Sequence, residues 1–220
     1  MIVLLENILR NHILICIFLA IILAAIFFIV KDTKHLNSIL FISLVSNFLS
    51  FNYILINTNN FDFSSHLPLH LCYLTEAIIL CTYFFNLKFL LPWLILNSLG
   101  GGITGFTNSN LDQDVHIIEY IHLYLSHFNL LLFSIIMFKK KFIIQKIDLY
   151  KSIILNASIF FTIIWINNLI GSNYWFTLEK PPGTNLTNIL PDWPGYLIVM
   201  VAIGIFSYIV TYRIFKLNRK

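Results

Sequence analysis

Two histidines and one cysteine stand close together at the entrance to a long apolar run. The segment reads His66-Leu-Pro-Leu-His70-Leu-Cys72, and Glu76 follows one helical turn after the cysteine. Ionisable groups at a membrane boundary are costly, so they are functional candidates by default. A thiol near an imidazole is typical of nucleophilic catalysis, in which the imidazole accepts the thiol proton and the sulfur attacks a carbonyl carbon.

Each of these residues also has a structural interpretation. A cysteine in an apolar helix is often a small buried hydrophobe, and histidines suit the headgroup level of a bilayer. Glu76 is harder to explain in this way, because a carboxylate in lipid must be paired or protonated. The glycines at positions 100–102 and 105 favour close helix packing, and an oxyanion role for their N–H groups stays open.

A base for Cys72 would come from a second polar segment, residues 117–138. Two polar helical stripes run along this segment, one through His122 and one through His127, so it belongs inside a bundle. At 1.5 Å per residue, Cys72 lies roughly 7–8 Å below its boundary. His122 lies at a similar depth and His127 nearer ~15 Å, so depth favours His122 and leaves His127 open.

The chain as a whole has the composition of a membrane protein. Of its 220 residues, 58% are hydrophobic and 11% are charged, and the mean hydropathy is +0.82. Seven windows are long enough to cross a ~30 Å hydrocarbon core, and inside lipid they must be helices. We therefore predict an all-α fold, a single integral membrane domain over residues 1–220 with seven transmembrane helices. The predicted spans are residues 12–30, 36–56, 67–85, 89–106, 117–138, 152–170 and 196–215.

Basic residues are distributed unequally between the two sides of these spans. Arg10 and Lys180 lie on one side, and the other 12 lie on the opposite side, which is therefore predicted to be cytoplasmic. We expect the N-terminus outside and the C-terminus inside. The formal charge of +4 then needs no nucleic-acid partner, because these residues form an inner collar facing anionic headgroups. They are Lys31, Lys34, Lys88, Lys139, Lys140, Lys141, Lys146, Lys151, Arg213, Lys216, Arg219 and Lys220.

This orientation places the chemically versatile residues on the outer side. The histidine–cysteine segment, the second polar segment and the residues after the sixth span, Gly171-Ser-Asn173-Tyr174, all reach that level. Asp112 and Asp114 lie there too and are expected to be solvated loop residues. A reaction centre in this protein is therefore expected to face outward.

Several strings of the chain together resemble a known family. They are Leu67-Pro-Leu-His-Leu-Cys72, Leu99-Gly-Gly-Gly102, Ser126-His127, Gly171-Ser-Asn-Tyr174 and Pro191-Asp-Trp-Pro-Gly-Tyr196, in this order. The combination resembles the YwaF-like family of bacterial integral membrane proteins, which is related to the vertebrate TMEM-type acyltransferase acting on ether phospholipids. The resemblance covers about residue 67 to the last span, and the first two spans match in hydropathy alone.

The resemblance implies a cysteine–histidine acyl-transfer centre with Cys72 as nucleophile and His127 as base. The chain departs from the family pattern at Thr107-Asn-Ser-Asn110 and at Leu178-Glu-Lys-Pro181, which bears on the substrate rather than the centre. The residues expected to bind substrate or stabilise an oxyanion are His70, His122, Glu76, Asn173 and Tyr174.

The leading hypothesis is a lipid acyltransferase or transacylase of the cell membrane, in a bacterial plasma membrane, with no cofactor. Its partner is a membrane phospholipid or other acyl lipid, since an outward-facing site is poorly placed to receive a charged cytosolic donor such as acyl-CoA. One alternative is a metal-dependent lipid hydrolase using His66, His70 and His122. Another is a small transporter or a non-catalytic lipid-binding protein, although no inverted repeat is visible.

Overall fold

The computed structural model describes residues 11–111, 115–183 and 185–218, and every regular element in these ranges is a helix. In chain order they are α2 (His12–Ile29), α3 (Thr33–Asn57), α4 (Leu71–Phe84), η1 (Lys88–Leu90), α5 (Leu91–Thr107), α6 (Ile117–Lys139), α7 (Lys146–Ile170), η2 (Tyr174–Phe176), η3 (Leu186–Ile189) and α8 (Gly195–Leu217). The prediction of an all-α fold is confirmed for this part of the chain.

Six of the seven predicted spans coincide with helices long and apolar enough to cross a membrane, counting η1 with α5. The third is different. Helix α4 begins at Leu71 rather than 67 and has 14 residues, about 21 Å at 1.5 Å per residue. Turns occupy the four residues before it, and Pro68 disfavours helical backbone at the residue that precedes it. The third predicted span is thus a shorter apolar helix.

The sixth predicted span, by contrast, starts earlier than expected. Helix α7 begins at Lys146, six residues before the predicted start at 152. A capping box explains the extension, because the Asp148 carboxylate accepts a hydrogen bond from the Gln145 backbone N–H at 2.9 Å. The polar first turn of α7 was therefore missed by counting apolar residues alone.

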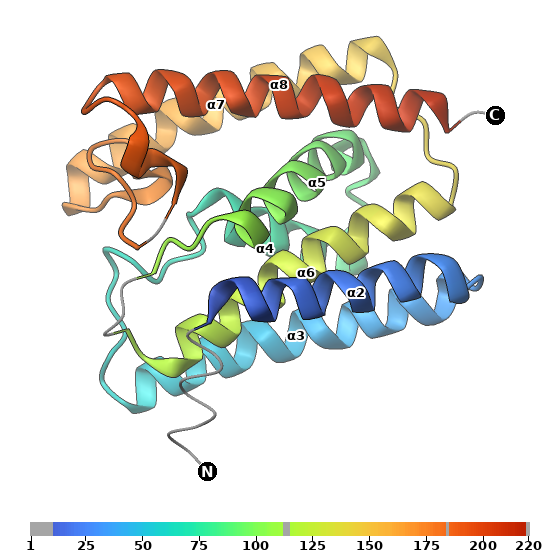
Figure 1. Cartoon of the computed structure of the whole chain (residues 1–220), viewed down its shortest axis with the longest axis horizontal. Coiled ribbons are helices and arrows are strands. Elements are labelled where there is room, and N and C mark those ends of the chain that lie inside the picture. Colours follow the sequence, from blue (N-terminus) through green and yellow to red (C-terminus); the bar gives the residue numbers. More distant parts are fainter. Residues whose placement is uncertain (1–10, 112–114, 184, 219–220) are drawn as a thin grey trace.

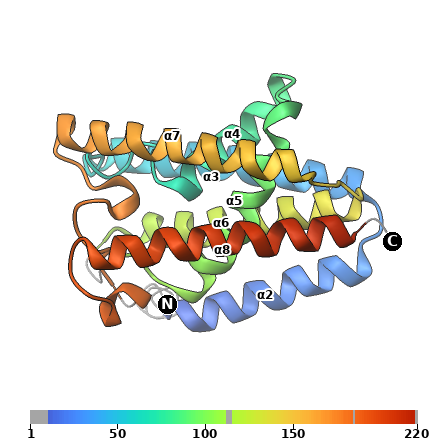
Figure 2. The same ribbon diagram turned by 90° about the horizontal axis from the view of Figure 1, so that it is seen from above.

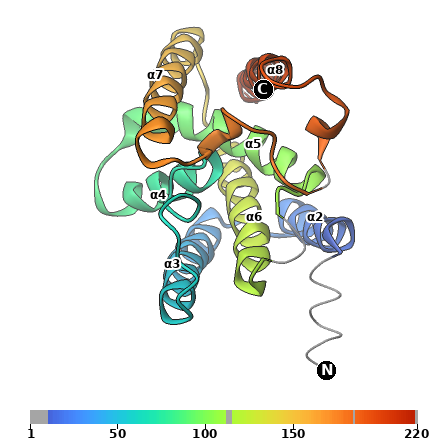
Figure 3. The same cartoon turned by 90° about the vertical axis from the view of Figure 1, so that its left-hand side faces the viewer.

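The helices form layers around α5 and α6. Figure 3 shows α7 and α8 on one side, α2, α3 and α6 on the other, and α4 with α5 between them. Helix α5 runs obliquely to the long helices (Figures 1 and 2). It packs against α4, α6, α7 and α8, and α6 is the most buried of the candidate spans. The central position of α5 lets it contact residues from several helices.

Apolar side chains cover much of the outer surface. Ile13, Phe28 and Phe161 are about 70% exposed, for example, at 70%, 78% and 68%, and α2, α7 and α8 bury few of their residues. A soluble protein rarely exposes so much continuous apolar surface. Lipid is the solvent that fits it, so the chain is a multi-pass membrane protein.

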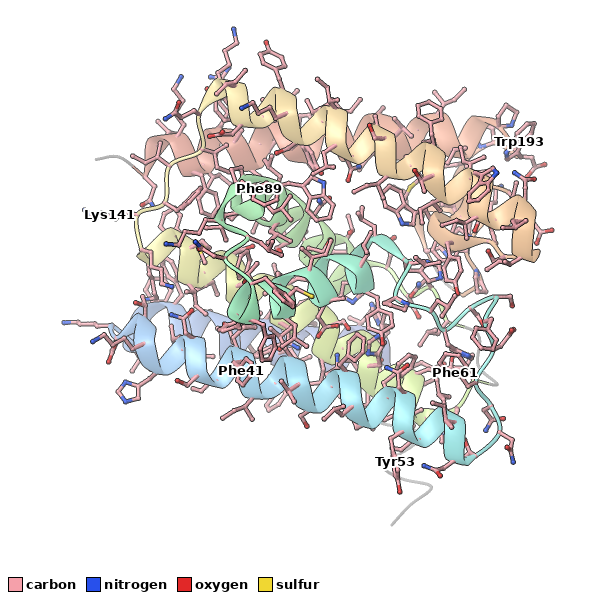
Figure 4. The ribbon with its side chains drawn as sticks, turned by 180° about the vertical axis from the view of Figure 1, so that it is seen from behind. Phe41, Tyr53, Phe61, Phe89, Lys141 and Trp193 are labelled. Atoms are coloured by element: carbon pink, nitrogen blue, oxygen red, sulfur yellow. The ribbon has the colours of Figure 1, made fainter. Side chains whose placement is uncertain are left out.

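The bundle has two chemically different ends. We call the end that carries residues 58–70, 108–111, 115–116, 171–183 and 185–194 the loop end. The end with the α2–α3 and α6–α7 connections is called the basic end (Figure 1). Figure 4 shows Lys141 at the basic end and Phe61 and Trp193 at the loop end. The position of Lys141 agrees with the charge distribution predicted from the sequence. The orientation of the bundle in a membrane stays a prediction.

Candidate functional site

Cys72 is the second residue of α4, at the end of the helix nearest the loop end. The preceding His70 is the N-cap and has extended backbone, with φ −61° and ψ 139°. Its side chain makes no capping hydrogen bond, so the imidazole is free to contact other groups. Cys72 is partly exposed and is a free thiol, which meets the first requirement for a nucleophile, namely access to a substrate.

Two glycines of α5 provide the space in which Cys72 and His127 lie. A β-carbon placed on Gly101 would lie 3.2 Å from Cys72 Sγ, and one on Gly105 would lie 1.8 Å from His127 Cδ2. Gly101 and Gly105 are one turn apart on the same face of α5. The thiol from α4 and the imidazole from α6 are therefore brought to one face of a third helix.

The thiol and imidazole are neighbours without being in direct contact. A β-carbon on Gly105 would lie 2.1 Å from His127 Nε2, and β-carbons at i and i+4 are about 5–6 Å apart. Together with the Gly101–Cys72 spacing of 3.2 Å, this places Sγ and Nε2 within roughly 11 Å of each other. No hydrogen bond joins the two side chains among the described residues.

His127 has a defined protonation pattern within the structure. Its Nδ1 lies 2.7 Å from the carbonyl oxygen of Leu123, which can accept but not donate a hydrogen bond. Nδ1 therefore carries the proton, and in the neutral ring Nε2 holds the free lone pair. The ring is 7% exposed. This is the tautomer that a general base facing α5 requires.

Glu76 is the centre of a buried polar network between α3, α4 and α6. Its Oε1 accepts hydrogen bonds from Asn47 Nδ2 at 3.0 Å and Asn129 Nδ2 at 2.8 Å, and its Oε2 accepts one from Ser126 Oγ. Ser43 Oγ in turn donates to Asn129 Oδ1 at 2.6 Å. Glu76 is 1% exposed, and its partners in this network are neutral amide and hydroxyl groups rather than a cation.

His122 belongs to the Glu76 network rather than to the α5 face. Its Nδ1 lies 3.3 Å from Asn47 Oδ1, and its ring stacks on Phe51 with centroids 3.9 Å apart. Tyr73 packs edge-on against the same ring at 4.5 Å. His122 therefore faces α3, while His127 faces α5. Depth along α6 favoured His122, but depth does not report the direction in which a side chain leaves the helix.

The loop after α7 fastens the segment that precedes Cys72. Tyr174 donates from its hydroxyl to the Phe63 carbonyl at 2.7 Å and accepts from the Leu67 N–H at 3.0 Å. Burial raises the pKa of Tyr174 to about 12, so the hydroxyl keeps its proton at neutral pH. Trp175 Nε1 donates to the Leu69 carbonyl at 2.7 Å. Residues 63–69 are thus tied to η2.

Asn167 at the end of α7 is a residue whose importance the sequence did not reveal. It is fully buried, and its Nδ2 donates to the Tyr174 carbonyl and to Thr177 Oγ1, both at 2.8 Å. Its Oδ1 accepts from Ser172 Oγ at 2.7 Å and from the Tyr174 N–H at 2.9 Å. Asn167 therefore organises the loop that contacts the segment before Cys72. In the sequence, the Asn167-Asn168 pair shortly before the Gly171-Ser-Asn-Tyr174 string is the one feature that could have indicated this role.

The two oxyanion candidates nearest this loop differ in availability. Asn173 is used inside its own loop, since its Nδ2 donates to the Glu179 carbonyl and its Oδ1 accepts from the Leu178 N–H. His70 Nδ1 faces the Trp175 N–H at 3.4 Å. In that arrangement the neutral His70 ring carries its proton on Nε2, which makes it a donor two residues from Cys72. His70 fits the role better than Asn173.

The histidines of the alternative metal site do not converge. His66 Nδ1 accepts from the Asp62 N–H at 2.8 Å, and its Nε2 lies 3.5 Å from Glu119 Oε2. Within the described ranges, no group of three or more metal-ligating side chains gathers in a geometry that could hold an ion. Asp112 and Asp114, interpreted from the sequence as solvated loop residues, lie outside these ranges. The donor set of His66, His70 and His122 therefore does not fit a metal centre.

A second imidazole and thiol, those of His12 and Cys16 on α2, lie next to α6. His12 packs against Tyr124 with ring centroids 5.6 Å apart, and Cys16 Sγ lies 3.7 Å from His12 Nε2. Cys16 is 4% exposed. Burial of this thiol leaves Cys72 as the more accessible of the two.

Comparison with known proteins gives one family match. A family model described as the TMEM164 family matches residues 8–212, a range that contains every candidate site residue. No match was found among curated proteins or among solved structures. The TMEM-type relationship expected from the motifs is thereby confirmed, and the YwaF-like assignment remains a prediction.

Proposed function

Because the chain belongs to the TMEM164 family, we propose that this membrane protein transfers acyl chains between lipids through Cys72 and His127. The observation that carries the proposal is the shared glycine face of α5. Gly101 borders the thiol and Gly105 borders the imidazole, so two groups from different helices lie along the same face of α5.

In the first half of the proposed reaction, Cys72 attacks the carbonyl carbon of a lipid ester. The thiol proton passes to His127 Nε2 through the bound reacting group or a water, and then to the departing lysolipid oxygen as the C–O bond breaks. The products are a thioester on Cys72 and a lysolipid hydroxyl. His70 Nε2–H supplies a hydrogen bond to the oxyanion of the tetrahedral intermediate.

In the second half, an acceptor hydroxyl attacks the thioester carbonyl. His127 takes the hydroxyl proton and returns it to the sulfur as the C–S bond breaks, which restores the thiol. Water in place of the acceptor gives hydrolysis. We further propose that the loop end faces the outer side of a bacterial plasma membrane, where phospholipid is the donor.

The thioester is the intermediate to detect. We expect the purified full-length protein, incubated with an acyl-labelled phospholipid, to carry one hydroxylamine-sensitive acyl group by intact-mass spectrometry. The Cys72→Ala variant should lose the adduct, while Cys81→Ala, which removes a thiol elsewhere on α4, should retain it. An adduct of unchanged amount on Cys72→Ala contradicts the assignment.

The choice of base is tested by a matched pair on α6. His127→Asn should slow adduct formation by about 10²–10⁴-fold, the usual contribution of a general base. His122→Asn removes an imidazole one turn away and should leave the rate within a few-fold, provided the variant folds. Equal losses in both variants would show that packing of α6, rather than proton transfer at His127, limits the rate.

A further inference from the structure

A cavity of about 190 Å³ opens on the side of the bundle, where α4 ends and η1 begins. Its polar wall is formed by Asn37, Thr82 and Asn86, and Lys88 and Lys140 complete it. The floor is apolar and includes Leu91 and Phe133. The combination of cationic wall and apolar floor matches a ligand that carries a negative charge next to hydrocarbon.

The two lysines of the cavity lack an acidic partner. Lys140 Nζ donates to Asn37 Oδ1 at 3.3 Å, and no ion pair of Lys88 or Lys140 with a carboxylate occurs among the residues that the structure describes. Partial burial lowers the pKa of Lys140, as expected for an ammonium group that has lost water without gaining an anion. An anionic ligand would stabilise the charged ammonium group of Lys140 in place of the lost water.

The position of the cavity favours a lipid over a soluble anion. The connection between α4 and α5 protrudes sideways from the bundle (Figures 2 and 3), and Phe84, Phe85 and Phe89 beside it are 65%, 62% and 76% exposed. Apolar rings of this exposure belong in lipid. Lysines next to them are typical of the level of the headgroups, where long cationic side chains reach the phosphates.

We infer that this cavity binds the headgroup of an anionic phospholipid, with Lys88 and Lys140 against its phosphate. Asn37, Thr82 and Asn86 then supply hydrogen bonds to headgroup oxygens, and the apolar floor contacts the first carbons of an acyl chain. Cys72 is at the opposite end of α4, so this lipid is not the acyl donor of the proposed reaction. The site is independent of that proposal and would hold α3, α4 and α6 together.

The test is lipid retention by the full-length protein in detergent, measured by native mass spectrometry. Phosphatidylglycerol should bind at one copy per chain and more tightly than phosphatidylcholine. The K88Q/K140Q variant should weaken phosphatidylglycerol binding by about 30-fold, from the contribution of two lysines near a headgroup. The control K31Q/K34Q removes the same charge from two exposed lysines, Lys31 in the α2–α3 connection and Lys34 in the first turn of α3, and should leave this affinity unchanged.

Three results would overturn the inference. One is equal loss in the two lysine pairs, which would show a general effect of net charge. Another is equal retention of the two phospholipids by the unaltered protein. The third is displacement of phosphatidylglycerol by inorganic phosphate at millimolar concentration, which would identify a site for soluble anions. Thermal unfolding of both variants is the control for folding. A loss of about 1 kcal/mol in stability would shift Tm by about 2–4 °C in a chain of this size. A smaller shift from the unaltered protein shows that misfolding does not cause the loss of lipid binding.

Discussion

The close approach of Gly105 to His127 makes Gly105→Ala the most informative substitution. The added methyl group would lie 1.8 Å from His127 Cδ2 and 2.2 Å from Cγ, far inside van der Waals contact. His127 cannot turn away without losing the hydrogen bond from its Nδ1 to the Leu123 carbonyl. Either α5 and α6 separate or the imidazole leaves its position.

The magnitude follows from two opposing effects. Overpacking a core by a methyl group costs about 1–3 kcal/mol, whereas replacing a helical glycine by alanine contributes roughly 0.5–1 kcal/mol of stability. The net loss is on the order of 1–2 kcal/mol. For a chain of this size that corresponds to a fall in Tm of roughly 2–8 °C.

Gly204→Ala is the matched control. Gly204 lies in α8, and a β-carbon there would meet nothing within 4 Å, so only the helical gain applies and Tm should stay level or rise slightly. Both variants would be compared by thermal unfolding in detergent and by the rate of acyl capture on Cys72. Gly105→Ala as stable and as reactive as Gly204→Ala would refute the packing described for α5 and α6.

Two further predictions concern the residues that hold the site in place. Glu76→Ala removes the acceptor of Asn129 Nδ2 and one of the two acceptors of Asn47 Nδ2, and it should lower stability by about 1–3 kcal/mol. Glu76→Gln keeps an acceptor oxygen and should cost less, as measured by thermal unfolding. Equal losses would contradict the hydrogen-bonded role of the carboxylate. Asn167→Ala should release the loop 171–194, because four hydrogen bonds end on that side chain, and protease should then cleave the loop faster. Asn168→Ala, which removes one exposed bond to the Ile164 carbonyl, should not change the cleavage rate.

Much of the fold was accessible from the residues, and the exceptions have local causes. Long apolar runs predict helices because lipid offers no partner for free backbone groups. The predicted start of α4 is too early because the apolar run begins at Leu67, whereas residues 67–70 form turns and bends and the helix begins only at Leu71. The start of α7 was misplaced for the opposite reason, since its first turn is polar and is stabilised by the capping carboxylate of Asp148.

The candidate site was predicted less completely. Cys72, Glu76 and the two α6 histidines are visible in the sequence because polar groups are rare in such helices. The partners of Glu76 are not, since Asn47 lies 29 positions and Asn129 lies 53 positions away along the chain. Asparagine is unremarkable in a sequence until a buried carboxylate is found beside it.

The sequence by itself determined that this protein is a helical membrane protein with a thiol and several imidazoles toward one end, because hydropathy and charge act locally along the chain. Only the tertiary structure decided which imidazole shares a face with the thiol. His122 and His127 differ by five positions on one helix, so they leave it in different directions, and which of them faces the same side of α5 as Cys72 depends on where α5 packs. Because Gly101 and Gly105 have no side chain, α5 can pack closely against Cys72 of α4 and His127 of α6. This close packing involves three helices and is therefore not visible in the sequence of any one of them.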